Sequence, residues 1–335
     1  MSAPSSPRRA RPTRARLIGV VATAAVIACA LACTACGRGA GDGPSAGTSS
    51  IAKPTAFPRT IRDAAGVTLT IPAKPQRIVS QTLGTDEILF AICPPTRIVG
   101  VSTFARDGAY SHVVDAVRAA GQPAIDSTET VIGLKPDLIF VASYSRADLI
   151  EVLRASGAPV FRFSNFDRIA DIMTNIRTVA YAIGEDAAAE QLVADMEARL
   201  ARVRARAAAS GRRPRVMSYD GTGYTAGSDT LFDDVIRVAG GVNAAAASGA
   251  KGFMRVGGEQ MLSWKPDYLI VGAKPGEEEI VRRRMLANPA VASSDAVKGG
   301  RLVLMDTRIF LTTSQHVVSA AEALADALHG PEAPR

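Results

Sequence analysis

Short apolar runs rich in β-branched residues alternate with amphipathic stretches along most of the chain. The runs have the length and composition of buried strands: RIVSQ (77–81), RIVGVS (97–102), DLIFVAS (137–143), PVFRF (159–163) and RVMSYD (215–220). Segments with helical spacing of apolar positions lie between them, including TDEILFAI (85–92) and TLFDDVIRVAG (230–240). Strands that alternate with helices predict parallel sheets covered by helices, so we expect an α/β fold.

A long helical segment divides this pattern into two halves. Over residues 186–210, Leu192, Met196, Leu200 and Val203 recur at spacings of four and three, which gives one apolar stripe. Acidic residues gather at its start and arginines toward its end, a polarity that complements the helix dipole. Some two dozen residues at ~1.5 Å each form a rod of roughly 36 Å. We expect this helix to join two lobes.

The two halves contain an internal echo. ETVIGLKPDLIFV begins at Glu129, and EQMLSWKPDYLIV begins at Glu259, 130 residues later. In both copies, Lys-Pro-Asp separates a short helical segment from an apolar strand, because proline disfavours continuation of the helix before it. Related units on either side of a long helix predict a bilobal protein with a cleft between the lobes.

The net charge of +7 comes largely from residues 1–36. This segment contains five arginines and no acidic residue, so the rest of the chain carries a net charge of only about +2. That charge is too small to indicate a basic surface for nucleic-acid binding. An apolar run over 17–32 follows the arginines and is too short for a typical membrane span. We therefore expect a secretory signal peptide over 1–36.

Three of the four cysteines cluster at the end of this segment. A cysteine that follows an apolar run and small residues is the acceptor pattern of bacterial lipoproteins. We favour Cys36 as the lipidated residue, because a Gly/Ser-rich linker follows it over 37–58, with Cys29 and Cys33 as alternatives. An ordinary secreted protein is the other interpretation. The expected location is the extracytoplasmic face of the cell membrane. The remaining cysteine, Cys93, is expected to be a buried side chain that fills the core rather than a nucleophile.

Several segments resemble, in their order and spacing, the periplasmic binding proteins that serve iron–siderophore and vitamin B12 importers of the ABC type. They are KPQRIVS (74–80), RIVGVS, ETVIGLKPDLI, AGSDTLFDDVIRVAGGVN (226–243), EQMLSWKPDYLI and SAAEALADAL (319–328). The resemblance covers residues 60–330. It implies two Rossmann-like α/β lobes joined by a single long α-helix, with a ligand cleft between them and little hinge motion. The lobes would then span 59–185 and 211–330, with the interlobe helix at 186–210.

The resemblance also implies that one acidic residue on each lobe docks onto the permease subunits. The matching residues are Glu129 and Glu259, the same pair that begins the internal echo. Two carboxylates, one on each lobe, would orient the cleft over the transport pore. The alternative is that they are first-turn acids that stabilise only their own helices. The expected partners are an ABC permease dimer and, through it, its ATPase, and we expect the protein to be a monomer.

Ligand-binding side chains are expected on loops at the carboxyl ends of the strands. The candidates are Gln81, Thr82, Phe104, Arg106, Tyr110, Tyr144, Arg146, Tyr219, Tyr224, Arg255, Arg308 and Phe310, with Leu83, Thr103, Thr225 and Phe253 beside them. Arginine and tyrosine together suit an anionic, aromatic or oxygen-rich ligand. We therefore expect a ferric siderophore, with cobalamin or haem as the alternative cargo on the same scaffold. No cofactor is expected, and iron would enter only as part of the siderophore.

Other functions have weaker support from the sequence. The three histidines, His112, His316 and His329, show no close spacing, so no bare-metal site is expected. GTGYTAG (221–227) lacks the Gly-Lys-Ser/Thr ending of a phosphate loop and is interpreted as a mobile or ligand-facing loop. A chelatase-like enzyme of tetrapyrrole or metal chemistry is the alternative from another class, and an adhesin or sensor is a third. The export signal and the single mature cysteine disfavour a metallocluster enzyme, so we expect no enzymatic activity.

Overall fold

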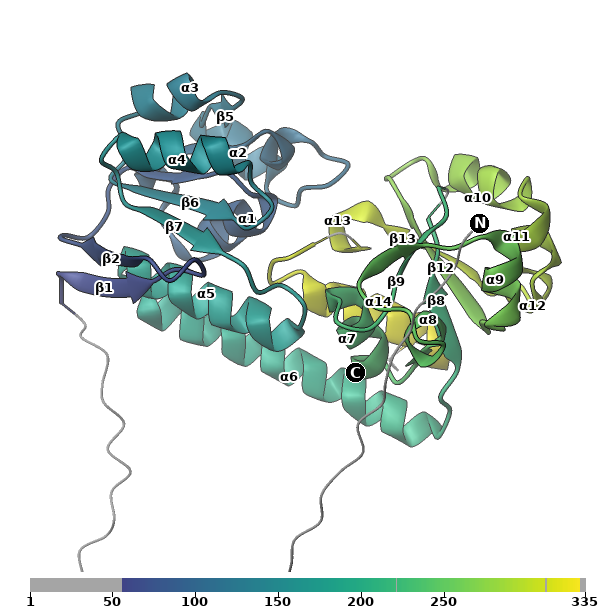
Figure 1. Cartoon of the computed structure of the whole chain (residues 1–335). Coiled ribbons are helices and arrows are strands. Elements are labelled where there is room, and N and C mark those ends of the chain that lie inside the picture. The colour runs from purple at the N-terminus through teal and green to yellow at the C-terminus, as the bar shows by residue number, and fades with distance from the viewer. Residues whose placement is uncertain (1–55, 221, 311, 332–335) are drawn as a thin grey trace, which may run out of the picture. The chain divides into compact units, whose positions relative to one another are not determined.

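The computed structural model of the chain describes residues 56–220, 222–310 and 312–331. The predicted signal peptide, nearly all of the predicted linker and the three candidate lipidation cysteines lie outside the described residues. Figure 1 shows two α/β lobes, and the long helix α6 runs along one side of both. We refer to residues 56–185 as the first lobe and to 211–331 as the second lobe.

A five-stranded parallel sheet with the order β5-β4-β3-β6-β7 forms the centre of the first lobe. Its strands are β3 (Ile78–Ser80), β4 (Ile98–Ser102), β5 (Ala124–Ile125), β6 (Leu138–Ala142) and β7 (Val160–Phe163). Every residue of β3 and of β6 is buried, which explains why the sequence shows continuous apolar runs there. An antiparallel hairpin of β1 (Arg59–Arg62) and β2 (Thr68–Ile71) precedes the sheet.

Helices and short helical turns connect these strands. They are α1 (Leu83–Ile92), η1 (Pro95–Arg97), η2 (Thr103–Arg106), α2 (Val114–Ala120), α3 (Thr128–Gly133), α4 (Ala147–Ala155) and α5 (Ile169–Ile183). Thr82 caps α1, because its side chain accepts a hydrogen bond from the backbone N–H of Thr85. This cap fixes the position at which the chain leaves β3 and enters the helix.

The second lobe contains a four-stranded parallel sheet with the order β10-β8-β12-β13. Its strands are β8 (Arg215–Ser218), β10 (Val242–Asn243), β12 (Tyr268–Ala273) and β13 (Leu302–Asp306). Its helices are α7 (Leu231–Val238), α8 (Ala244–Ala247), α9 (Gly258–Ser263), α10 (Glu278–Leu286), α11 (Pro289–Ser293), α12 (Asp295–Lys298), α13 (Thr307–Phe310) and α14 (Val317–His329).

A two-stranded antiparallel ribbon of β9 (Tyr224–Ala226) and β11 (Phe253–Arg255) adjoins this sheet. GTGYTAG was interpreted as a mobile or ligand-facing loop, and the loop assignment was wrong for Tyr224–Ala226, which form a strand. That this segment faces a ligand stays a prediction. The pairing partner lies almost thirty residues further along the chain, so local sequence could not reveal it. Ala226 is also held by the side chain of Ser218, which accepts its backbone N–H at 3.0 Å.

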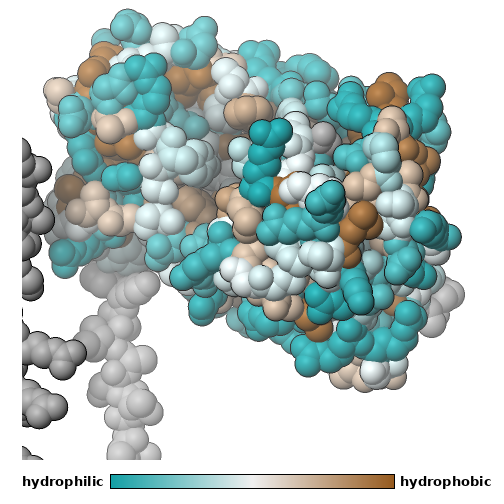
Figure 2. Space-filling view, turned by 45° about the vertical axis from the view of Figure 1, so that its right-hand side comes forward, coloured by the Kyte–Doolittle hydropathy of each residue, from teal (hydrophilic) through white to brown (hydrophobic). Residues whose placement is uncertain are grey.

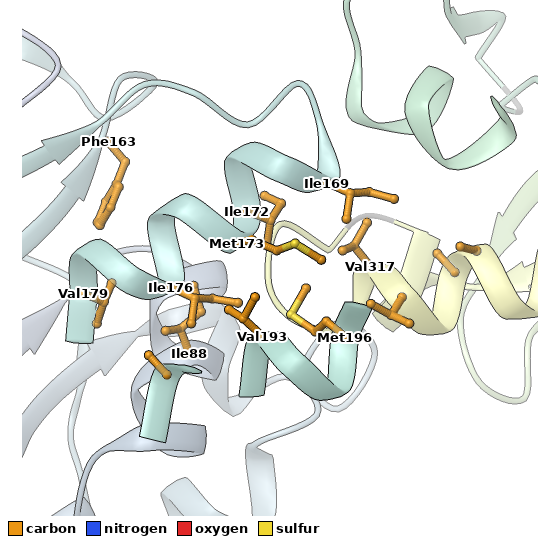
Figure 3. Packing of buried hydrophobic residues seen from close by; sticks show 14 of the residues in the cluster. Ile88, Phe163, Ile169, Ile172, Met173, Ile176, Val179, Val193, Met196 and Val317 are labelled. Carbon is orange, nitrogen blue, oxygen red and sulfur yellow. The ribbon is translucent and has the colours of Figure 1, made fainter. Parts of the chain in front are cut away.

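The helix α6 (Asp186–Ser210) connects the lobes, and Gly211 ends it in a left-handed conformation with φ of 62°. It packs against α1 and α5 of the first lobe and against α7 and α14 of the second. One continuous hydrophobic cluster includes residues of both lobes. Figure 3 shows Val193 and Met196 of α6 between Ile176 of α5 and Val317 of α14. The predicted fold class, two α/β lobes joined by a single long helix, is confirmed.

Ion pairs add polar links along α6. Arg199 contacts Glu322 of α14 at 2.6 Å, and Arg206 contacts Asp326 of the same helix at 2.5 Å. The arginines that the sequence analysis related to the helix dipole therefore also hold the second lobe. Among the described residues, no helix combines the length and apolar character needed to cross a membrane.

Candidate functional site

Each lobe has a cavity at the carboxyl ends of its strands. The first-lobe cavity has a volume of about 470 Å³, and Gln81, Phe104 and Arg146 of the predicted set line it. The second-lobe cavity has a volume of about 390 Å³, and Tyr224 and Phe310 of the predicted set line it together with Phe253. Both cavities therefore lie at the strand ends where ligand contacts are expected, and ligand binding by these residues stays a prediction.

The β9-β11 ribbon presents one face to the second-lobe cavity and to solvent. Tyr224 lies opposite Arg255 and Ala226 lies opposite Phe253, so Tyr224, Arg255 and Phe253 share a face of the ribbon. Their side chains are exposed, whereas Thr225 between them is buried. The ribbon thus places two aromatic rings and a guanidinium on one face.

Large aromatic side chains are exposed in both lobes. The exposed fraction is 54% for Phe104 and 66% for Tyr144 in the first lobe, and 48% for Tyr224 and 74% for Phe253 in the second. Such side chains usually lie inside a protein. On the face seen in Figure 2, hydrophobic residues occur in small separate groups among hydrophilic ones. The exposed rings that border the cavities are therefore candidates for ligand contact rather than parts of a broad apolar surface.

The segment that follows β4 touches the second lobe. The ring of Tyr110 packs edge-on against Phe104, with 5.8 Å between the centroids, and Nζ of Lys274 lies 5.4 Å from the Tyr110 ring centroid. The hydroxyl of Thr307 donates a hydrogen bond to the carbonyl oxygen of Ala109. These contacts join the loops of the two lobes beside the cavities.

Two of the four predicted arginines have acidic partners two residues away in the sequence. Arg146 forms an ion pair with Asp148, and Arg308 forms one with Asp306 at 2.5 Å. The latter pairing raises the pKa of Arg308. Arg106 and Arg255 are exposed, and no ion pair involves either of them within the described part of the chain. The positive charge available to a ligand is therefore smaller than the sequence suggested.

Two of the predicted ligand-binding residues have side chains that are buried in the fold. Thr82 is 5% exposed and caps α1, and Tyr219 is 4% exposed and belongs to a hydrophobic cluster of the second lobe. Neither is among the residues that line the two cavities described above. Their positions at strand ends were correct, but their side chains point into the fold.

A buried carboxyl group supports the first-lobe loops. Asp86 is fully buried and accepts hydrogen bonds from the backbone N–H and the hydroxyl of Ser102, the latter at 2.5 Å. Burial raises the pKa of Asp86 to about 7, although the hydrogen bonds from Ser102 and Ser80 oppose this shift. The contact ties α1 to the end of β4, where the loop with Phe104 begins.

A second buried acid lies beside two histidines that are far apart in the sequence. Potential ligand atoms of Glu87, His112 and His316 all lie within 4.8 Å of one another, and the two imidazole rings stack with 3.8 Å between their centroids. Desolvation lowers the pKa of both imidazoles, that of His316 to about 4, with further contributions from nearby positive charge. Spacing along the chain gave no sign of this group.

The two glutamates of the internal echo occupy equivalent places in the lobes. Glu129 lies in the first turn of α3 and Glu259 in the first turn of α9, and both are exposed. Glu129 also contributes to the lining of the first-lobe cavity.

Comparison with known proteins identifies the family. Residues 78–309 match the family model described as periplasmic binding protein. A cobalamin-binding protein of Halobacterium salinarum is 28% identical over 316 residues, which cover 93% of this chain and 85% of the relative. An uncharacterised ABC transporter substrate-binding lipoprotein of Bacillus subtilis, YvrC, is 26% identical over 285 residues, covering 83% of this chain and 87% of the relative.

The fold is also similar to that of a solved structure. The periplasmic haem-binding protein RhuT from Roseiflexus sp. RS-1, in its apo form, superposes with a TM-score of 0.66 at 27% identity, covering 76% of this chain and 98% of the other. Together with the two lobes, the bridging helix and the cavities at the strand ends, these matches confirm the resemblance noted from the sequence. The chain belongs to the periplasmic binding protein family, whose members are extracytoplasmic, non-enzymatic substrate-binding components of ABC transporters.

Proposed function

We propose that this protein binds a cobalamin-type corrinoid between its lobes and delivers it to an ABC permease. The observation that carries the proposal is a set of four exposed aromatic rings. Phe104 lines the first-lobe cavity, Tyr224 and Phe253 line the second-lobe cavity, and Tyr144 follows β6 in the first lobe. A conjugated macrocycle such as a corrin offers a π-face to such rings, and stacking adds to the free energy of burying their surface. The cobalamin-binding relative, similar over 93% of the chain, supports the same cargo.

The charge near the cavities favours a corrinoid over haem. Haem carries two carboxylates on its edge and needs cations to hold them, whereas the side chains of a corrin ring are mostly neutral amides. Arg146 and Arg308 are already paired with aspartates, so part of the cationic character is neutralised within the protein. Neutral hydrogen-bonding groups at the cavities, such as those of Gln81 and Thr225, suit amides.

The sequence analysis expected a ferric siderophore first and named cobalamin or haem as the alternative. The named relatives favour the alternative, because one is a cobalamin-binding protein and another a haem-binding protein. The aromatic and arginine side chains that suggested a siderophore serve a macrocycle equally well. We therefore propose the corrinoid as the main cargo.

A titration of the full chain against four ligands tests this choice. Hydroxocobalamin, haemin, a ferric hydroxamate and a ferric catecholate are added separately, and binding is followed by absorbance and calorimetry. We expect saturable binding of one hydroxocobalamin per chain, tighter than that of any other ligand. Preferential binding of haemin, or of either siderophore, would overturn the corrinoid assignment.

We also propose that the chain is held at the membrane by a lipid on Cys36, with residues 1–36 as the signal peptide and 37–58 as the linker. The lipoprotein relative from Bacillus subtilis and the cysteine after an apolar run support this. Cys36→Ser should release the protein from the membrane fraction of expressing cells, whereas Cys33→Ser should leave it bound. Retention of the Cys36→Ser protein would show that another cysteine, or no cysteine, is lipidated.

We propose that Glu129 and Glu259 dock the protein onto its permease. Both side chains are exposed in the first turn of short helices at corresponding positions of the two lobes. Complementary charge at two separated points would fix the orientation of the binding protein on a permease dimer. A direct test of this pair is described in the Discussion.

A further inference from the structure

Three side chains from separate parts of the chain meet between the lobes. Glu87 lies on α1, His112 lies in the segment before α2, and His316 lies immediately before α14. Their nearest potential ligand atoms are within 4.8 Å of one another. The two imidazole rings are stacked, with 3.8 Å between their centroids and an interplanar angle of 30°.

Glu87 positions both histidine-bearing segments. Its Oε1 accepts the backbone N–H of His112 at 3.0 Å, and its Oε2 accepts the hydroxyls of Ser314 at 2.5 Å and Thr312 at 3.4 Å. The side chain of Ser314 in turn accepts the backbone N–H of His316 at 3.4 Å. A carboxylate has about four lone-pair sites, and these three bonds leave one for a further partner.

We propose that Glu87, His112 and His316 form a binding site for a single divalent transition-metal cation such as Zn²⁺. Two imidazoles and one carboxylate, with water in the fourth position, are a ligand set that zinc adopts in proteins. Zinc bonds of ~2.0–2.2 Å require the three groups to close around the ion from their present separation. His112 is exposed, so the ion has access to the site from solvent.

The surroundings of the cluster are compatible with a cation. The two arginines that act electrostatically on the histidines are Arg308 and Arg199, and each forms an ion pair with a carboxylate, Asp306 and Glu322 respectively. The buried Oε1 atom of Gln315 has no hydrogen-bond partner among the described residues. This residue precedes His316, and its oxygen can accept a hydrogen bond from a water on the metal.

The site would join the two lobes and lies next to the second-lobe cavity. Glu87 and His112 belong to the first lobe, whereas His316 leads into α14 of the second. Thr312, which donates to Glu87, also lines the second-lobe cavity. A bound ion would therefore link the segments on which the cavity depends. This inference is independent of the identity of the cargo.

Calorimetry with Zn²⁺ on the full chain, stripped with a chelator and free of cargo, tests the site. We compare wild type with His112→Ala and His316→Ala, and use His329→Ala as the matched control because His329 lies at the other end of α14. Wild type should bind one Zn²⁺ ion at this site. Each test variant should bind Zn²⁺ with at least tenfold lower affinity, and the affinity of the control should match that of wild type. The melting temperature should rise with Zn²⁺ concentration in wild type and in the control only.

Co²⁺ absorbance separates this site from the three cysteines near the N-terminus, because thiolate ligands add an intense charge-transfer band in the near ultraviolet. We expect visible bands of a nitrogen and oxygen ligand set, which disappear in both histidine variants. Equal Zn²⁺ binding by wild type and both variants, or no binding by wild type, would refute the site. Glu87 is buried, so Glu87→Gln serves only as a supplementary variant.

Discussion

Lys135 and Lys265 adopt the same left-handed backbone conformation at equivalent places in the two lobes, with φ of 46° and 48°. Each follows a short helix and precedes a Pro-Asp pair that begins a central strand. A left-handed lysine is unusual, because its Cβ approaches the following carbonyl group. Its occurrence in both lobes shows that the internal echo of the sequence is also a repeat of backbone geometry.

The same hydrogen bonds hold both copies. The carboxylate of Asp137 accepts the backbone N–H of Arg77, and that of Asp267 accepts the backbone N–H of Arg215. The guanidinium of each arginine donates to carbonyl oxygens at the end of the short helix, that of Leu134 in one lobe and that of Trp264 in the other. The helices that bear Glu129 and Glu259 are thus fixed to their sheets in the same way.

The first prediction concerns these two glutamates. Glu129→Gln combined with Glu259→Gln removes both charges while keeping side-chain size. Transport should fall to background, because the charged contacts that dock the protein onto the permease are lost. Uptake of labelled cobalamin by cells that express the cognate permease measures this effect. Asp115→Asn with Glu279→Gln is the control, because it also removes two exposed charges. Normal uptake by the test variant would exclude the docking role, and since Glu129 borders the first-lobe cavity, weakened binding would assign it to the cargo instead.

The second prediction concerns the core between the lobes. Met196→Ala removes a side chain that is 1% exposed and lies between α5 and α14, so it should lower the free energy of unfolding by about 2–5 kcal/mol. Because the hydrophobic cluster includes residues of both lobes, denaturant unfolding should remain a single transition. Leu286→Ala, at a side chain that is 43% exposed, should have little effect. Two separate transitions would show that the lobes fold independently.

The third prediction concerns pH and Asp86. The carboxyl group has a folded-state pKa of about 7 and an ordinary value of 3.8. Between these pH values it takes up a proton when the chain folds, and it favours the folded state most at low pH. This contribution is lost as pH rises from about 4 through 7 and amounts to about 4 kcal/mol over the window. Asp86→Asn should therefore gain stability relative to wild type as pH increases from 4 to 8. Denaturant unfolding with a chelator present measures the difference, and a pH-independent difference would contradict the assigned pKa.

The fourth prediction concerns the exposed rings. Phe104→Ala and Phe253→Ala should each weaken hydroxocobalamin binding by about 1–3 kcal/mol, because each removes one apolar contact surface from the cargo. Both side chains are more than half exposed, so thermal stability should not change. Ile280→Ala, an exposed position on α10, provides the comparison. Unchanged affinity in the double variant Phe104→Ala/Phe253→Ala would show that neither ring contacts the cargo.

Much of the fold could be predicted from the sequence, because its signals are local. The central strands are apolar runs of few residues, and the long helix ends at Gly211, where glycine accepts a left-handed conformation. The cavities could be placed because carboxyl ends of parallel strands share one edge of a sheet. The burial of Cys93 was also expected from its apolar surroundings, and it is 5% exposed.

What the sequence could not show depends on contacts between distant residues. The β9-β11 ribbon requires pairing of Tyr224 with Arg255, and the metal-ligand cluster requires α14 to return to α1. The direction of a side chain at a strand end is equally a tertiary property. Thr82 and Tyr219 are therefore buried although their neighbours line or border the cavities.

A crystal structure of the full chain with hydroxocobalamin tests the central claim most directly. We predict one intact corrinoid between the lobes, in contact with Phe104 or Tyr144 on one side and with Tyr224 or Phe253 on the other. A ligand bound to a single lobe away from these rings, or one that is chemically altered, would contradict this account.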